Sequence, residues 1–439
     1  MKTFFSLRKA LGQIPQKICV LTIIIATTVG LAFARSNATA GSEYVAHEWG
    51  TFTSVQASDG ALLNWQAVAP VELPAFVYSW ARPGLNRVAL PNLNKGQMAL
   101  QRMETPVVYF YGSRNQKVDL TVQFPKGKIT EWYPQAKVIG PSTPPSTTPG
   151  YDLAQLLSRT RESLIRWNFE ILPPVQNSSI TLPMEKSGNH YFAARETDAA
   201  VLRVSPTESG HPSIEYEKFL FYRGVGNFGT PLKVTMSASG EVTLANTGPE
   251  ALRDLFLLGV DHGSGNFVHI SGLAPGEQKT LHLDLDKHNT PLQELAPRVG
   301  ADFAMALTGQ GLYQRESEAM VKTWRDSWFQ EQGLRVLYIL PRAWTDQTLP
   351  IDLKPEPSAL VRVMVGRAEL ITPTLENKLT EQLTRAKAGD AAAWANAKIL
   401  LNECGRFALP VFDRILTKLD PKREDKVLAA LLSEPAHFD

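Results

Sequence analysis

The sequence predicts a mostly β protein with an α-rich C-terminus: tandem β-sandwich-like domains, the second immunoglobulin-like, followed by short helices. Two observations predict it. From about residue 43 to residue 290, short apolar and β-branched runs alternate with Gly, Pro and Asn, as in antiparallel strands. After Pro291 the apolar residues recur at helical spacing, and N-cap residues such as Thr372 precede the last segments.

The first forty residues have the three parts of a secretory signal. Five basic residues and no acidic residue precede Glu43. An apolar run over 18–34 overlaps the small-residue triplet 32–34 and is followed by a second triplet, 38–40. The run is shorter than the roughly 20 residues that span a bilayer. We therefore expect residues 1–40 to be a cleaved signal peptide and the protein to be exported, to the periplasm or the extracellular space; an uncleaved membrane anchor is the alternative.

Removal of this leader changes the charge and the cysteine content. The whole chain has 45 Lys and Arg against 43 Asp and Glu; without the five leader cations the balance is 40 against 43, or −3. This balance does not predict a nucleic-acid partner. Cys19 lies in the leader, which leaves Cys404 alone in an apolar helical pattern. We expect a fold that relies on packing and has no internal disulfide.

Four segments are predicted after the leader. Residues 41–205 form an N-terminal β-rich domain, residues 206–290 an immunoglobulin-like sandwich, residues 291–370 a mixed α/β segment and residues 371–439 a helical region. In the first domain we expect a short helix at 152–163 and strands at 107–111, 118–124, 129–133, 164–172 and 190–194.

The later elements follow from turn and cap signals. In the sandwich, strands are expected at 214–222, 232–238, 241–245, 252–260, 267–271 and 279–285. Beyond it we expect a helix over 314–331, strands at 334–340 and 360–365, and helices that begin after Thr372, Asp390 and Asp420.

The first candidate site is the motif HEWGTFTS at residues 47–54. His47 offers a metal ligand, Glu48 a catalytic acid or base, and Trp49 a binding surface. Neighbouring residues on a regular strand point to opposite faces, so His47 and Glu48 can share a site only at a bulge or a strand end. A structural strand with a hydrogen-bonded histidine is the alternative.

This motif also carries a resemblance. Together with RMETPVVYFY at 102–111 and LRVLYILPR at 334–342, it resembles a family of exported bacterial proteins of uncharacterised activity. The resemblance covers most of the mature chain. It implies export and a single-family organisation, and it implies no activity, cofactor or catalytic residue.

The second candidate is a set of carboxylates among aromatic residues. Glycosidases use two carboxylates about 5–5.5 or 6.5–9.5 Å apart, and aromatic neighbours can raise a carboxyl pKa and stack on sugars. Glu104 and Glu196 are candidate catalytic residues, in addition to Glu48. Glu131, Trp132 and Arg195 are candidate binding residues, and His190 is a second candidate metal ligand. Ordinary strand residues and an arginine–carboxylate network are the alternatives.

Two functions therefore remain. The first is an exported multidomain binding or scaffold protein of the bacterial envelope, with a glycan or protein ligand and membrane contact only through an uncleaved leader. The second is a secreted hydrolase, with or without a divalent metal cofactor, whose site lies around His47 and Glu48. The sequence contains no recognised spacing of catalytic residues, which favours the binding or scaffold protein. The density of His, Arg, Glu and Trp in the N-terminal domain favours the hydrolase.

Overall fold

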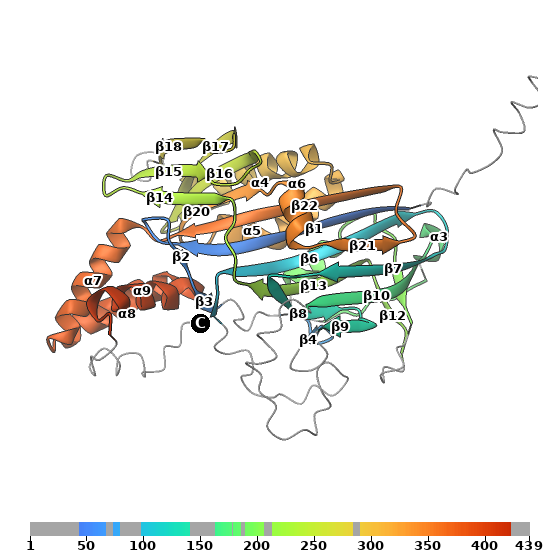
Figure 1. Cartoon of the computed structure of the whole chain (residues 1–439), viewed down its shortest axis with the longest axis horizontal. Coiled ribbons are helices and arrows are strands. Elements are labelled where there is room, and N and C mark those ends of the chain that lie inside the picture. Colours follow the sequence, from blue (N-terminus) through green and yellow to red (C-terminus); the bar gives the residue numbers. More distant parts are fainter. Residues whose placement is uncertain are drawn as a thin grey trace, which may run out of the picture. The chain divides into compact units, whose positions relative to one another are not determined.

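An 11-stranded sheet organises the chain (Figure 1). Strand β2 (Leu62–Leu63) pairs with β1 (Tyr44–Gln56) at its side, and β1 is parallel to β22 (Ala359–Leu370). Across the sheet the other strands are β19 (Thr290–Pro291), β17 (Ser264–Leu273), β16 (Leu252–Asp261), β20 (Gly333–Ile339), β22 (Ala359–Leu370), β1 (Tyr44–Gln56), β6 (Gln101–Gly112), β13 (Phe219–Gly226), β8 (Gly127–Tyr133) and β4 (Tyr78–Ser79).

Smaller sheets and helices complete the fold of this computed structural model. A six-stranded sheet contains β12 (Glu215–Glu217), β11 (Leu202–Val204), β10 (Leu164–Ile171), β7 (Gln116–Gln123), β21 (Ile351–Lys354) and β9 (Val138–Gly140). A three-stranded sheet contains β14 (Leu232–Met236), β15 (Glu241–Asn246) and β18 (Gln278–His282), and a pair contains β3 (Trp65–Gln66) and β5 (Met98–Ala99). The helices are α3 (Pro174–Asn177), η2 (His190–Arg195), α4 (Leu292–Gly309), α5 (Gln314–Phe329), α6 (Arg342–Thr348), α7 (Pro373–Lys387), α8 (Ala391–Glu403), η3 (Gly405–Phe407) and α9 (Ala408–Leu419).

The structure describes residues 44–66, 73–79, 98–140, 163–177, 179–185, 189–205, 213–283 and 290–422. The predicted leader, residues 152–162 of the helix predicted at 152–163, and most of the helix predicted after Asp420 lie outside these residues. No helix among them is long and apolar enough to cross a membrane.

Strand β1 is buried on both faces, and each face meets different elements. His47, Trp49, Thr51, Thr53 and Val55 alternate along the face that we call the helix face, because its ends contact α5 and the group of α7, α8 and α9. The intervening residues lie on the face that we call the sheet face. There Phe52 contacts α6 and Gln56 bonds to β14. Each face of β1 thus leads to a different part of the protein.

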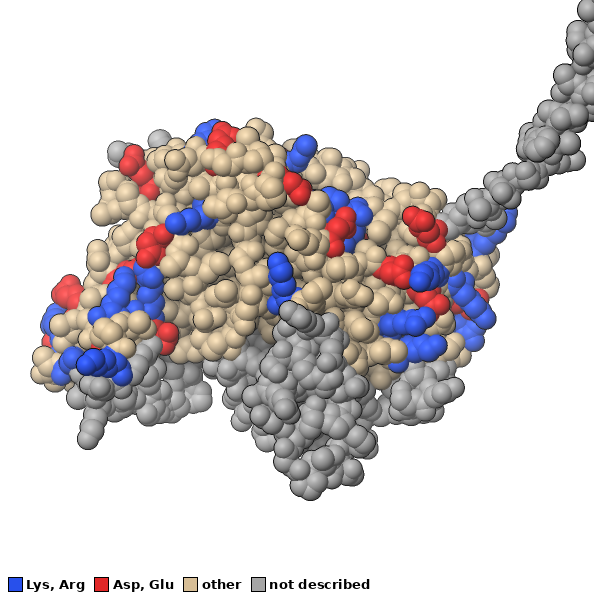
Figure 2. All heavy atoms as spheres, viewed as in Figure 1, with Lys and Arg blue, Asp and Glu red and all other residues tan. Residues whose placement is uncertain are grey.

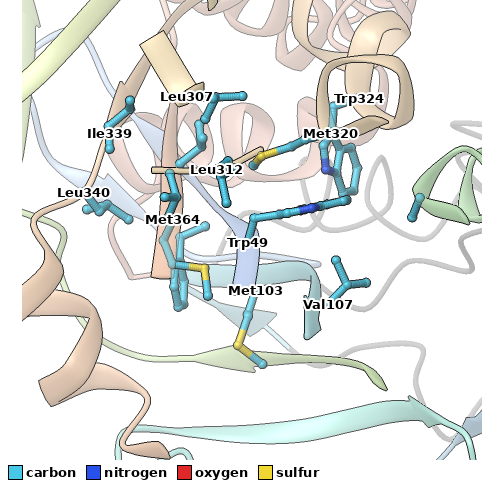
Figure 3. Close-up of a cluster of buried hydrophobic side chains, with 14 of the residues drawn as sticks. Trp49, Met103, Val107, Leu307, Leu312, Met320, Trp324, Ile339, Leu340 and Met364 are labelled. Carbon is cyan, nitrogen blue, oxygen red and sulfur yellow. The ribbon is translucent and has the colours of Figure 1, made fainter. Parts of the chain in front are cut away.

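The core on the helix face forms around Trp49. This side chain is fully buried, as are Met320 and Trp328 of α5, and Trp324 is 7% exposed. Figure 3 shows Trp49 close to Met320 and Trp324. Along α5, positions 316, 320, 324 and 328 recur every four residues, which places them on one side of the helix. Helix α5 is thereby fixed over the middle of β1.

Most of the predicted elements are confirmed, and the mostly β fold with helices toward the C-terminus is confirmed with them. The strand predicted at 190–194 is wrong. That segment is the 3-10 helix η2, because the Asn189 side chain accepts a hydrogen bond from the Tyr191 amide and starts a helical turn. Helix α4 was not expected from the sequence, since Pro297 and Gly300 interrupt its helical pattern.

The large sheet takes strands from three of the four predicted segments. β1 and β6 come from 41–205, β13, β16 and β17 from 206–290, and β20 and β22 from 291–370. Residues 206–290 also supply the whole three-stranded sheet. Figure 2 shows acidic and basic side chains interspersed on one face of the molecule.

Helix α8 supplies a test of local stability. The Asp390 carboxylate accepts a hydrogen bond from the Ala393 amide at 3.0 Å, so it caps the helix. We expect Asp390→Ala to lower the free energy of unfolding, because the Ala393 amide loses its side-chain acceptor. Asp390→Asn keeps a capping oxygen and is the matched control. Urea unfolding measures both, and equal losses in the two variants would contradict the cap.

Candidate functional site

His47 belongs to a buried cluster on the helix face. Its Nδ1 atom lies 2.7 Å from Oε2 of Glu316, and both side chains are buried, at 2% and 0% exposure. The Tyr111 hydroxyl donates to the other Glu316 oxygen at 2.7 Å. The Tyr313 amide donates to Oε2 of Glu316 at 2.8 Å, which closes the N-terminal capping box of α5. We call His47, Tyr111, Tyr313 and Glu316 the histidine cluster.

The histidine cluster has the geometry of an oriented imidazole. The His47 ring centroid lies 4.4 Å from that of Tyr313 and 5.4 Å from that of Tyr111. Burial raises the pKa of Tyr111, and Glu316 raises it further, so this phenol stays protonated and donates to Glu316. A carboxylate on one ring nitrogen fixes the imidazole's orientation, as in general bases and in structural links between elements.

Glu48 lies on the opposite face and does not join His47. The Arg362 Nε atom donates to Oε2 of Glu48 at 2.5 Å, and the Tyr222 hydroxyl donates to Oε1 at 2.5 Å. Arg362 also donates to Asp346 at 2.7 Å. Burial opposes the charged form of Arg362, but Glu48 and Tyr222 outweigh it and raise the arginine pKa. The strand alternation thus separates the two residues of the motif.

A second buried cluster lies on the helix face near the other end of β1. Glu104 accepts from Arg406 Nη1 at 2.6 Å and from the Thr53 hydroxyl at 3.1 Å, and Arg102 Nε lies 3.4 Å away. Adjacent ion pairs join Arg367 with Glu331, Arg367 with Glu369, Arg335 with Glu369 and Arg223 with Glu131. Nine side chains make up what we call the arginine cluster: Arg102, Arg223, Arg335, Arg367, Arg406, Glu104, Glu131, Glu331 and Glu369.

The arginine cluster makes stability depend on acid pH. Burial alone raises the pKa of Glu104, but Arg406, Arg102 and Arg367 outweigh it and lower the pKa from 4.5 to about 2. A lowered folded-state pKa contributes stability that is present above the unfolded value and lost as pH falls toward the folded value.

We therefore expect the free energy of unfolding to fall as the pH drops from 4.5 toward about 2. The fall should be smaller in Glu104→Gln, which has no proton to take up. Urea unfolding at several pH values measures this difference, with Glu170→Gln as a partly exposed control. An identical acid slope in wild type and Glu104→Gln would contradict the prediction.

Glu131 and Trp132 point to opposite faces. Arg223 binds Glu131 through two bonds, Nε to Oε2 at 2.9 Å and Nη2 to Oε1 at 2.7 Å. Burial raises the pKa of Glu131, but Arg223 outweighs it and the pKa is lowered. Trp132 donates from Nε1 to Gln135 at 3.1 Å and stacks on Tyr78. The two candidate binding residues therefore do not form one surface.

The candidates from η2 also separate. The centroid of the His190 ring lies 5.5 Å from that of Trp324. Trp324 is eight residues along α5 from Glu316, which is the partner of His47. Eight residues of helix span about 12 Å, so the two histidines meet α5 at distant points. Arg195 binds Glu217 with contacts of 2.9 and 2.6 Å. Among the described residues, no three His, Cys, Asp or Glu side chains are grouped as metal ligands.

Glu196 is exposed and lies outside both clusters. Its side chain is 53% exposed and pairs at 2.7 Å with Lys322, itself 59% exposed. Such a pair contributes little to stability because water screens it. Of the three candidate catalytic carboxylates, Glu48 lies on the sheet face, Glu104 on the helix face and Glu196 at the surface.

Described residues line at least two hollows on the surface. One is a groove of about 700 Å³ between α4 and α5. Its lining includes small residues such as Ala301 and Ala304 and longer charged ones such as Lys322 and Arg325. The other is a cleft of about 350 Å³ between the end of the large sheet and α7 and α8. Glu369 of the arginine cluster lines this cleft.

The sequence-based selection missed the arginines of the cluster and Glu316. Arg362, Arg367 and Glu369 interrupt the apolar run of β22, and Arg102 precedes the apolar part of β6. Charges inside a near-continuous apolar strand are a signal for buried ion pairs, because an isolated buried charge is unfavourable. Glu316 lies three residues after Tyr313 at the start of α5. A glutamate at that position is explained by helix capping alone, so the sequence carried no signal for its contact with His47.

Comparison with known proteins adds little to this geometry. No model of a known protein family matches the chain, and no curated protein does. Among solved structures, the yeast delta-COP-I mu-homology domain aligns with a TM-score of 0.27 and 9% identity, over 76% of this chain and 100% of that one. The same yeast domain in complex with a Dsl1 WxWxV peptide aligns with a TM-score of 0.26 and 9% identity, over 75% and 97%.

Proposed function

We propose that this chain is an exported binding or scaffold protein of the bacterial envelope, with a glycan or protein ligand. The observation that carries the proposal is the state of the candidate catalytic carboxylates. Glu48 and Glu104 are buried against arginine, and Glu196 pairs with Lys322. A general acid must hold a proton near neutral pH, and Glu104, with a pKa of about 2, does not.

The groove between α4 and α5 offers a place for the ligand. Small residues of α4 such as Gly300, Ala301 and Ala304 line it, so an apolar group of a partner can enter between the helices. Met305 at its border is 67% exposed. In this proposal residues 206–290 keep their immunoglobulin-like interpretation and present a further surface, the three-stranded sheet.

The hydrolase is the second candidate, and the histidine cluster favours it. Glu316 orients the His47 imidazole as a carboxylate orients a general base. A divalent metal held jointly by His47 and His190 is not part of this candidate, because the two histidines meet α5 at points about 12 Å apart and metal ligands lie about 2 Å from the ion. In the described conformation, however, His47 is only 2% exposed. A substrate would reach it only after α5 moved away from β1.

A panel experiment separates the two functions. Residues 41–439 are purified and tested against glycans, peptides and chromogenic ester and glycoside substrates, with fractionation of the full chain in a bacterial host to test export. We expect saturable binding without turnover, at least tenfold weaker in Ala301→Arg, which fills the groove. Gln278→Arg, on exposed β18, is the control.

Turnover that is lost in His47→Ala while that variant stays folded would overturn the binding proposal and support the hydrolase. Recovery of the chain only in the cytoplasmic fraction would overturn export. Binding that is equally weakened by Gln278→Arg would exclude the groove as the ligand site.

A further inference from the structure

The charges of the arginine cluster do not balance. It contains five arginines and four glutamates, so one positive charge is in excess. Arg102 shows the effect: burial lowers its pKa, Arg223 lowers it further, Glu104 only partly opposes them, and the pKa falls to about 9. A buried cation without full compensation is unfavourable unless an anion accompanies it.

Several donors of the cluster also lack acceptors. Five buried nitrogen atoms have no hydrogen-bond partner among the described residues: Nη1 of Arg102, Nη1 of Arg367, Nε and Nη2 of Arg406, and Nε1 of Trp65. Arg102, Arg367 and Trp65 are at most 2% exposed. A buried donor left without an acceptor destabilises the fold, because it has lost its bonds to water and gained none in the protein. A bound group is one way in which a native protein supplies acceptors to such donors.

These donors lie around Arg406. Arg406 and Arg102 share the Glu104 Oε1 atom at 2.6 and 3.4 Å, and Arg406 and Arg367 share Oε2 of Glu331 at 3.9 and 2.6 Å. The Arg406 guanidinium lies 5.7 Å from the Trp65 ring centroid. Arg406 therefore stands between the other two arginines and over the tryptophan.

The cluster reaches the surface at the same place. The Arg406 side chain is 21% exposed and that of Glu331 is 38% exposed, whereas Arg102 and Arg367 are almost completely buried. A ligand can thus approach Arg406 from solvent and extend toward the buried nitrogen atoms. Arginine is well suited to this role, because its planar fork of donors matches the oxygens of an oxyanion.

We propose that Arg102, Arg367, Arg406 and Trp65 form a binding site for a phosphate-class oxyanion, either free or as a terminal group of a larger ligand. A tetrahedral oxyanion offers several acceptor oxygens to the five donors and offsets the excess positive charge. A carboxylate offers only two oxygens. The site is distinct from the α4–α5 groove, so it does not depend on the proposed function.

Titration of residues 41–439 with inorganic phosphate, by calorimetry and by thermal unfolding at constant ionic strength, tests the site. We expect one saturable site for phosphate and at least tenfold weaker binding of acetate. Arg406→Gln should weaken phosphate binding at least tenfold, whereas Arg166→Gln, which removes an exposed arginine with its own aspartate partner, should not change it. Trp65→Phe keeps an aromatic side chain, removes the indole N–H donor and supplies a second variant if Arg406→Gln does not fold.

Equal binding of acetate and phosphate would overturn the phosphate class. Equal small effects of phosphate on wild type, Trp65→Phe and Arg166→Gln would overturn the site itself, since they would show ionic strength or nonspecific screening alone. Free phosphate and a phosphate group on a larger ligand are distinguished by comparing inorganic phosphate with a phosphomonoester such as glycerol phosphate. Tighter binding of the ester indicates the larger ligand.

Discussion

Glu48→Gln is expected to lower the free energy of unfolding by about 3–5 kcal/mol, the range for removing one partner of a buried ion pair. Glu48 and Arg362 have fully buried side chains, and the Arg362 Nε atom donates to Glu48 at 2.5 Å. Without the carboxylate, Asp346 is the one charged partner that Arg362 keeps among the described residues, and the Asp346 side chain is 44% exposed. The buried guanidinium then loses most of its compensation. Chemical denaturation measures the loss.

The controls separate burial from charge. Glu196→Gln removes an exposed carboxylate with a lysine partner, and its loss should stay below about 1 kcal/mol. The double variant Glu48→Leu with Arg362→Met removes both charges and should recover part of the stability lost in Glu48→Gln, because no unpaired charge remains. If Glu48→Gln were as stable as Glu196→Gln, the buried pair would not contribute as the structure indicates.

Trp49→Ala is expected to lower the free energy of unfolding by about 3–5 kcal/mol, because it leaves a cavity in the core. Trp49 is fully buried, and Figure 3 shows it close to Met320 and Trp324 of α5. The loss of this contact should loosen α5 from β1. Thermal and urea unfolding give the free energy, and near-ultraviolet circular dichroism reports the change in packing.

Met305→Ala is the matched control for Trp49→Ala. Met305 is also apolar and on the helical side of the fold, but it is 67% exposed, so its truncation should change stability by less than about 0.5 kcal/mol. A stable Trp49→Ala variant that loses ligand binding would show that Trp49 is a binding residue, as the sequence first suggested. A destabilised variant would show that its main role is in the core.

The motif at residues 47–54 illustrates how much of the site could be predicted. Strand alternation allowed His47 and Glu48 to share the candidate site only at a bulge or a strand end. In the structure they point apart, since their partners are Glu316 and Arg362. The identity of those partners could not be predicted. They lie 269 and 314 residues away along the chain, and no local pattern records such a separation.

The fold shows the same division. Runs such as those that became β7, β15 and β20, and caps such as Thr372 and Asp390, are local signals that the sequence itself contains. The turn at Asn189 has a local cause too, but a short aromatic segment beside it also suits a strand, and only the capping hydrogen bond distinguishes the two.

By itself the sequence determined the β-rich character, the positions of most strands and the C-terminal helices, because backbone propensity, alternation and capping act over a few residues. Only the tertiary structure decided which strands share the large sheet, which face of β1 receives α5, and that Arg102, Arg367 and Arg406 meet around Glu104 and Glu331. The reason is physical: register between distant strands places each charge, and burial then strengthens interactions that water would otherwise screen.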